Sequence, residues 1–171
     1  MISSSMISDI RALTFEDEEQ IIQLIKTSIY HGDQLHIGDL VASNQNVSNF
    51  YQFEVFPIIM EHDPIFGYFK ENKLLGLACC STKLNQMYEF KQRVALGGIT
   101  ITHPDYRRQG IGTKLRLAIG KDLYSRGIQK FVFEIKHDNE ASLQNAQKIS
   151  QNLQAQTNLV SFKFEGNTNV F

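Results

Sequence analysis

The chain has 171 residues, and its 17 lysines and arginines nearly balance its 18 aspartates and glutamates, for a formal net charge of −1. A chain of this length can bury one sizeable core, so we expect a single domain over residues 1–171. The near-neutral charge argues against a protein that wraps nucleic acid or lies on an anionic membrane.

The two cysteines, Cys79 and Cys80, are adjacent in an apolar run. This spacing fits neither a metal or redox Cys-x-x-Cys motif nor a disulfide framework. No apolar run approaches the roughly 18 residues of a membrane span, and the N-terminus lacks the pattern of a signal peptide. We therefore expect a cytoplasmic protein with neither a nucleic-acid nor a membrane partner.

The first elements predicted are a strand at 8–13 and a helix that follows it, with Thr14 as N-cap. Apolar residues recur through this helix at helical spacing. The acidic run at 16–19 allows two interpretations. It could form a subsite for a cationic substrate, or it stabilises the helix dipole, which is the more common role of acids in a first turn.

Residues 31–63 have the least regular pattern. HGDQLHIG is typical of a loop, whereas NFYQFEVFPIIM begins as a helix that Pro57 should interrupt. The aromatic residues of the second stretch either line a pocket or pack in the core, and the second role is the more common: Phe50, Tyr51, Phe53 and Phe56.

A β-hairpin is predicted next, with strands from 65 and from 73 joined by a short polar turn at Glu71-Asn72. A third strand covers 93–102. Its Gly97-Gly98 pair interrupts the β-branched pattern, which suggests a bulge or a close approach of two backbones.

The stretch HPDYRRQGIGTKL, residues 103–115, joins that strand to a helix expected at 113–126 and ended by Gly127. A glycine-rich turn between strand and helix aims unpaired N–H groups and the positive helix end at an anion. Arg107 and Arg108 add charge suited to phosphate. The turn lacks the third glycine of a dinucleotide fingerprint and the Gly-Lys-Ser/Thr of a Walker loop. We therefore expect it to hold a phosphate or pyrophosphate in another way.

Three more elements complete the prediction. FVFEI at 131–135 is a buried strand, a helix opens near Asn139, and LVSFKFE is a last strand.

The loop resembles the coenzyme loop of the GNAT N-acetyltransferases, Arg/Gln-x-x-Gly-x-Gly/Ala, and the resemblance covers roughly residues 10–150. It implies an α/β fold of the GNAT type: a mixed, mostly antiparallel sheet flanked by helices, in which strands at 94–102 and 131–136 splay apart. Acetyl-CoA would be the co-substrate, with its pantetheine arm between these strands. The residues that the resemblance assigns to coenzyme binding are Ile101, Thr102, Arg107, Arg108, Gln109, Gly110, Ile111, Gly112, Thr113, Asn139 and Ser142.

The same resemblance makes Glu134 a candidate general base, against the alternative of a carboxylate on the polar face of its strand. Two features depart from the family pattern. Ala146 stands where many relatives have a tyrosine that protonates the departing thiolate, and only about thirteen residues follow Asn158, so the last hairpin is short or atypical. A short hairpin would make a homodimer useful.

The leading hypothesis is an N-acetyltransferase that moves an acetyl group directly from acetyl-CoA to a primary amine in a ternary complex, without a metal. Positioning and polarisation outweigh a missing acid, because acid–base assistance contributes only about 10²–10⁴-fold. The alternative is a non-catalytic GNAT-fold module that binds acyl-CoA. A metalloenzyme is disfavoured because the five histidines lack paired-ligand spacing.

Overall fold

The computed structural model describes residues 8–33, 35–37, 40–83, 94–128, 130–132 and 140–152. The chain divides into two compact units, residues 1–134 and 135–171. The elements of the first unit follow in chain order: β1 Ser8–Ala12, η1 Phe15–Asp17, α1 Glu18–Tyr30, β2 His36–Ile37, β3 Leu40–Val41, α2 Val47–Phe50, η2 Tyr51–Val55, α3 Phe56–Met60, β4 Ile65–Lys70, β5 Lys73–Ser81, β6 Val94–Thr102, η3 Pro104–Tyr106, α5 Ile111–Ser125 and β7 Lys130–Val132. The second unit contains α6, Glu140–Asn152.

Five strands of the first unit form one mixed sheet in the order β1-β4-β5-β6-β7. The pairs β1–β4, β4–β5 and β5–β6 are antiparallel, and the pair β6–β7 is parallel. Beside them β2 and β3 form a two-stranded ribbon. The predicted mixed, mostly antiparallel sheet flanked by helices is confirmed.

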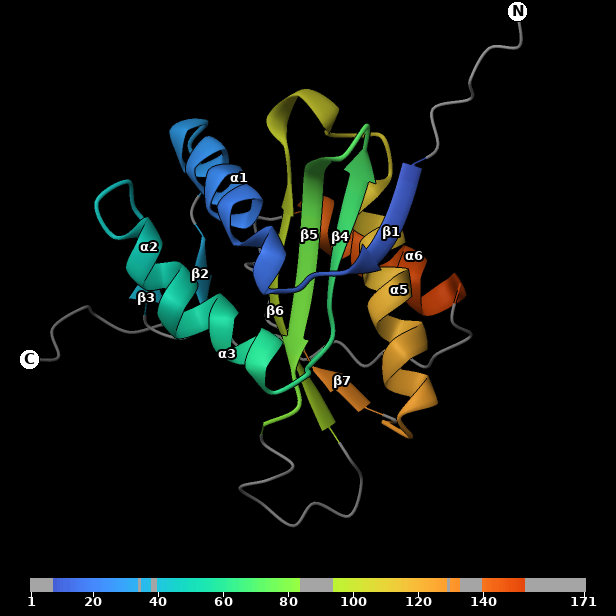
Figure 1. The fold of residues 1–171 in the computed structure, drawn as a ribbon. Coiled ribbons are helices and arrows are strands. Elements are labelled where there is room, and N and C mark those ends of the chain that lie inside the picture. The colour runs from blue at the N-terminus through green and yellow to red at the C-terminus, as the bar shows by residue number, and fades with distance from the viewer. Residues whose placement is uncertain are drawn as a thin grey trace, which may run out of the picture. The chain divides into compact units, whose positions relative to one another are not determined.

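Helices cover both faces of the sheet (Figure 1). One face packs against α1, α2 and α3 through a core that includes Ile21, Phe50 and Leu77. The other face packs against α5 through a second core that includes Leu75 and Leu115. Because alternate residues of a strand point to opposite faces, β5, buried along nearly its whole length, contributes to both cores.

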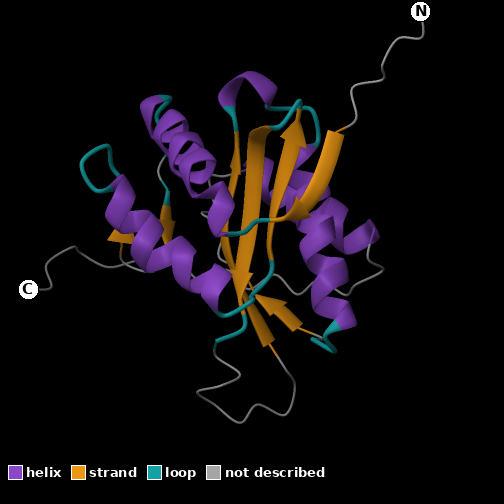
Figure 2. Cartoon of the chain, viewed as in Figure 1, coloured by secondary structure: helices purple, strands orange, loops and turns teal. Residues whose placement is uncertain are grey.

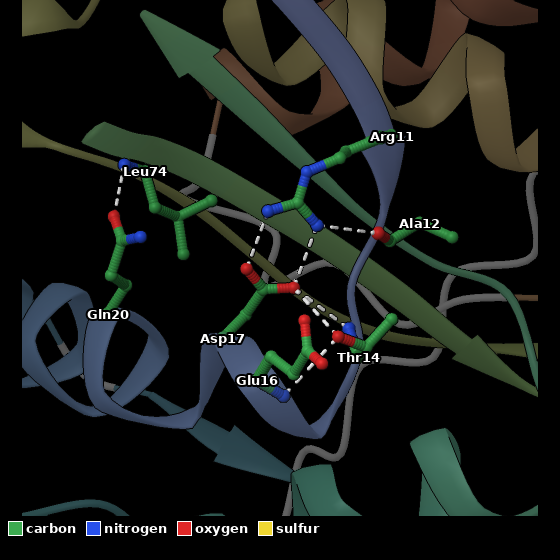
Figure 3. A network of polar contacts seen from close by, with 7 residues as sticks. All are labelled: Arg11, Ala12, Thr14, Glu16, Asp17, Gln20 and Leu74. Atoms are coloured by element: carbon green, nitrogen blue, oxygen red, sulfur yellow. Dashed lines mark hydrogen bonds and ion pairs between the residues drawn. The ribbon is translucent and has the colours of Figure 1, made fainter. Parts of the chain in front are cut away.

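Residues of β1 and of the helix start hold the first helix to the sheet (Figure 3). The Thr14 hydroxyl accepts from the N–H of Glu16, and the Asp17 carboxylate accepts from the N–H of Thr14, which forms a capping box. Arg11 donates to both oxygens of Asp17 at 2.6 and 2.8 Å. Thr14 is thus confirmed as the cap, although a short 3₁₀ turn, η1, precedes α1.

The predicted hairpin and bulge are both present. Glu71 and Asn72, between β4 and β5, have φ of 51° and 62°, the positive values that a type I′ turn requires. Ala78 of β5 pairs with Thr100 of β6, whereas Cys80 of β5 pairs with Gly97 of β6, so β6 has one extra residue that bulges opposite β5.

The aromatic stretch is helical from 47 to 60, as α2, η2 and α3 in succession. Pro57 does not end the helix. A π-helical turn, η2, comes just before it, and Pro57 stands in the first turn of α3, where its missing N–H costs little. Phe50 and Tyr51 are fully buried, as the core interpretation predicts, whereas Phe53 is 69% exposed.

Two expectations need adjustment at β7 and α5. The helix begins at Ile111, two residues before the expected start, because Gly110 is its N-cap. Val132 on β7 is 40% exposed instead of buried, whereas its neighbour Phe131 packs partly against the second core, because successive residues of a strand point to opposite faces. The helix near Asn139 is confirmed as α6, whereas the rest of the FVFEI strand and the final strand at 159–165 lie outside the described residues.

Candidate functional site

The glycine-rich loop connects the end of β6 to the start of α5 in the first unit (Figure 2). It begins with a 3₁₀ turn, η3, that starts after His103. Arg108 and Gly110 both have left-handed backbones, with φ of 62° and 76°. A Cβ placed on Gly110 would meet no atom within 4 Å, so it is the backbone angle rather than space in the protein that favours glycine here.

The start of α5 presents N–H groups that the helix itself does not use. The Lys114 N–H donates to the Gly110 carbonyl at 3.0 Å, which is the first backbone bond of the helix. The N–H groups of Ile111 and Gly112, one turn earlier, have no carbonyl of the helix to bond. The Ile111 side chain is buried in the α5 core, which holds this turn against the sheet. The arrangement is a fixed set of donors at a positive helix end, suited to an anion.

The two arginines of the loop have different surroundings. The Arg107 guanidinium forms an ion pair with Asp33, and its Nε donates to the Thr102 carbonyl at 3.4 Å. Arg108 is exposed, and no ion pair of its side chain is found in the described parts of the chain. Of the two, Arg108 therefore has its charge available for a phosphate.

His103 caps the loop in its neutral form. The imidazole Nδ1 accepts from the Asp105 N–H at 3.3 Å, and the backbone N–H of His103 donates to the Leu75 carbonyl of β5 at 2.8 Å. Burial, helped by Lys73, lowers the pKa of His103. An unprotonated Nδ1 is the form that can accept this bond, so burial and capping favour the same charge state.

The bulge of β6, earlier in the chain than the loop, brings the backbones of β6 and β5 close together. A Cβ on Gly98 would lie 2.7 Å from the Cys79 sulfur and 3.2 Å from its carbonyl oxygen, so only glycine fits without movement. Burial raises the pKa of the Cys79 thiol to about 12 and also raises that of Cys80. Neither thiol is a nucleophile in this state.

A model of the acetyltransferase (GNAT) family matches residues 19–149. The chain belongs to this family. Solved structures share its fold: an aminoglycoside acetyltransferase from an uncultured soil metagenomic sample, in complex with sisomicin, is 18% identical, with a TM-score of 0.61 over 94% of this chain and 97% of that one. No curated protein sequence matches the chain.

Two further GNAT structures are similar at the level of the fold. The PaiA N-acetyltransferase from Thermoplasma acidophilum, in complex with coenzyme A, is 19% identical, with a TM-score of 0.60 over 84% of this chain and 88% of that one. The ribosomal-protein-S18-alanine N-acetyltransferase from Escherichia coli is 18% identical, with a TM-score of 0.59 over 84% and 76%.

The described structure brings together most of the residues that the GNAT resemblance assigned to the coenzyme. Seven of them form the loop and the start of α5: Arg107, Arg108, Gln109, Gly110, Ile111, Gly112 and Thr113. Ile101 and Thr102 end β6 just before the loop, where they pair with Leu77 and Gly76 of β5. Ser142 lies on α6 in the second unit, while Glu134 and Asn139 lie outside the described residues.

The splayed strand pair of the GNAT fold is described in part. β6 spans the predicted 94–102, and Val94, Ala95 and Leu96 pair in parallel with β7. The predicted second strand, 131–136, is described only as far as Val132. The point at which the two strands separate stays a prediction.

The acidic residues at the start of α1 have two kinds of surroundings. Asp17 is buried and paired with Arg11, in agreement with a structural role. The other acids border an open hollow of about 540 Å³, lined by Glu16, Glu18, Glu19, Ile22, Gln23 and Lys26.

In the described part of the chain, no helix is long and apolar enough to cross a membrane.

Sequence reasoning missed the residues that brace the loop from a distance. Asp33 and Ser28 carry no motif, and Asp33 is 74 positions away from the arginine it contacts. The only available signal was an aspartate in a glycine-containing turn after a helix, which is too common to indicate a role.

Proposed function

We propose that this GNAT protein binds acetyl-CoA at the 107–113 loop and transfers its acetyl group to a primary amine, by direct attack in a ternary complex. The single observation that supports this most is the geometry of the loop: unpaired N–H groups at the start of α5, a left-handed glycine as cap and an exposed arginine. These groups match a pyrophosphate, and coenzyme A is bound in the structure of the PaiA relative.

The chemistry requires a group that accepts a proton from the amine, since a lysine-like ammonium has a pKa of about 10. We assign this role to Glu134 on the strength of the GNAT pattern. With Ala146 in the position of the family tyrosine, the thiolate leaves without a proton from that residue. This is feasible because a thiol has a pKa of only about 8.5. As part of the same proposal, the residues that bind acetyl-CoA belong to a single domain that spans residues 1–171.

The coenzyme part of the proposal is tested by thermal unfolding. A ligand that binds only the folded state at a hundredfold excess over Kd stabilises it by about 2.7 kcal/mol, which should raise Tm by about 5–10 °C. An unchanged Tm at saturating acetyl-CoA would contradict the proposal. Thiol release from acetyl-CoA across a panel of peptide, polyamine and aminoglycoside amines then tests the transfer, and binding without release from any amine would favour the acyl-CoA-binding module.

The chain offers a matched pair of glycines to test the loop itself. Gly110 and Gly127 stand at the two ends of α5 with φ of 76° and 73°, and a Cβ on either meets no atom within 4 Å. Alanine at either position should therefore cost about the same 1 kcal/mol of stability. We expect Gly110→Ala to weaken coenzyme A binding several-fold in calorimetry and Gly127→Ala to leave it unchanged. Equal effects on binding would contradict the role of this loop.

A further inference from the structure

The side chain of Arg107, the first residue of the proposed coenzyme loop, is bonded to other parts of the protein. Arg107 directs one terminal nitrogen to a carboxylate oxygen of Asp33, and its Nε to the Thr102 carbonyl at the end of β6. Both side chains of the ion pair are more than half covered, at 40% and 31% exposed. The guanidinium thus joins two chain segments instead of leaving its charge free for a ligand.

Asp33 is itself held in place by the end of α1. Its carboxylate accepts from the hydroxyl of Ser28, a side chain with no exposed surface, and its N–H donates to the Ser28 carbonyl at 3.1 Å. Gly32, with a φ of 88°, turns the chain directly after the helix. The carboxylate is therefore presented from a fixed helix end and not from a free side chain on a loop.

The ion pair of Arg107 with Asp33 lies next to a residue with an unusual backbone angle. Arg108, next to the ion pair, has a left-handed backbone without being glycine, a conformation that costs roughly 1 kcal/mol and persists only where neighbouring contacts impose it. Among the described residues, Arg108 is flanked on one side by Arg107 and its contacts, and on the other by the N-cap of α5.

We propose that Asp33 is a positioning residue for the coenzyme: through Arg107 it holds the 107–112 backbone in the shape that receives the pyrophosphate. The proposal rests on the acetyl-CoA function given above. It adds to that function a residue that is 74 positions away from Arg107 in the sequence. It also links the loop to the segment that follows α1. Asp33 does not touch the ligand, so its removal should change coenzyme affinity and leave the overall fold in place.

The experiment measures the Kd of coenzyme A by calorimetry for the full chain and its variants. We expect Asp33→Asn to raise Kd about tenfold, because a charge-assisted bond that shapes the site is lost. Asp33→Glu, which keeps the carboxylate, should stay within about threefold of the wild type. A double variant Asp33→Asn/Arg107→Gln should bind about as weakly as either single variant, because the two residues act as one unit.

The matched control is the ion pair of Asp122 with Arg126 at the other end of α5, whose side chains have similar exposure, 25% and 39%. Asp122→Asn should lower Tm about as much as Asp33→Asn and leave Kd unchanged. Hydrogen exchange of the amides at 108–112 should speed up in Asp33→Asn alone.

Two results would overturn the inference: a Kd for Asp33→Asn equal to that of the wild type, or additive effects of the Asp33 and Arg107 substitutions. A wild-type chain that does not bind coenzyme A would instead contradict the proposed function, so the two failures are distinct.

Discussion

At the scale of single residues, Asp17 shows how one carboxylate can join three parts of the fold. It accepts from Arg11 of β1, accepts from the N–H of the cap Thr14 and ends the turn before α1. The hydrogen bond from Arg11 is the main cause of a lowered Asp17 pKa, and burial opposes it. The Arg11 guanidinium also lies 4.0 Å from the centre of the Phe69 ring.

This lowered pKa makes a prediction about stability and pH. The unfolded chain protonates Asp17 near its ordinary pKa of about 3.9, above the pKa in the folded protein, so the contribution of Asp17 is present above pH 4 and is lost as pH falls through the folded value. We expect Asp17→Asn to lower the free energy of unfolding by about 1–3 kcal/mol at pH 7. The difference from the wild type should shrink below about pH 4 in urea titrations.

The control for this prediction is Glu16→Gln, since Glu16 is an exposed neighbour in the same turn. It should have little effect at either pH. A deficit of Asp17→Asn that is as large at pH 3 as at pH 7 would show that packing, and not the charge, is responsible.

A second residue-scale prediction concerns the proposed base. Replacing Glu134 by glutamine keeps its shape and removes a proton acceptor, so kcat should fall about 10²–10⁴-fold near neutral pH while the Kd of coenzyme A changes little. The rate profile against pH should lose its acidic limb. An unchanged kcat would assign Glu134 to the polar face of its strand, the structural alternative.

At the scale of elements, β6 owes its path to two adjacent glycines. The bulge at Gly97 and Gly98 lets β6 remain paired with β5 on both sides of the irregularity. It also brings Gly98 against Cys79, where a side chain does not fit. The bulge directly precedes the stretch of β6 that leads into the 107–113 loop, so its geometry helps to set where that loop begins.

We predict that Gly98→Ala destabilises the protein by about 1–3 kcal/mol, because the new methyl group collides with the Cys79 sulfur. Combining it with Cys79→Ala should recover part of the loss, since the sulfur is gone while the Cys79 carbonyl remains at 3.2 Å from the new atom. Urea unfolding of the wild type, both single variants and the double variant gives the coupling energy. Strictly additive losses would show that the sulfur contact does not decide the cost.

At the scale of the whole molecule, the sheet separates two cores. One is closed by α1 to α3 and the other by α5, and the 107–113 loop leads into the helix of the second core. Residues 135–171 form a separate compact unit of the chain. Segments shorter than about 40 residues rarely fold alone, so we propose that this unit depends on the rest of the chain for its stability.

The prediction is one cooperative unfolding transition for residues 1–171. Calorimetry should give a van't Hoff enthalpy equal to the calorimetric enthalpy, and the far-ultraviolet and tyrosine signals should change together. Saturating acetyl-CoA should shift the single transition as a whole. Two separate transitions, only one of them raised by acetyl-CoA, would contradict the single-domain proposal.

Local signals explain why much of this fold was predictable from the sequence. Glu71-Asn72 between two apolar alternating runs predicts the hairpin, Gly97-Gly98 predicts the bulge, and Gly127 predicts the end of α5. Each depends on backbone angles or periodicity within a few residues. The glycine turn between β6 and α5 belongs to the same class, because consecutive residues specify it.

Other features depend on residues that only the folded chain brings together. The sequence by itself predicted that the 107–113 loop suits an anion, and the family pattern in it led to the hypothesis of acetyl-CoA. It did not indicate that Arg107 pairs with Asp33 instead of standing free, that the helix runs past Pro57 through a π-helical turn, or that Val132 is exposed. The physical reason is the distance along the sequence between the residues that interact. A turn or a cap is specified by a few consecutive residues. An ion pair between distant residues, and the exposure of a strand residue, depend on which elements the tertiary structure places beside each other.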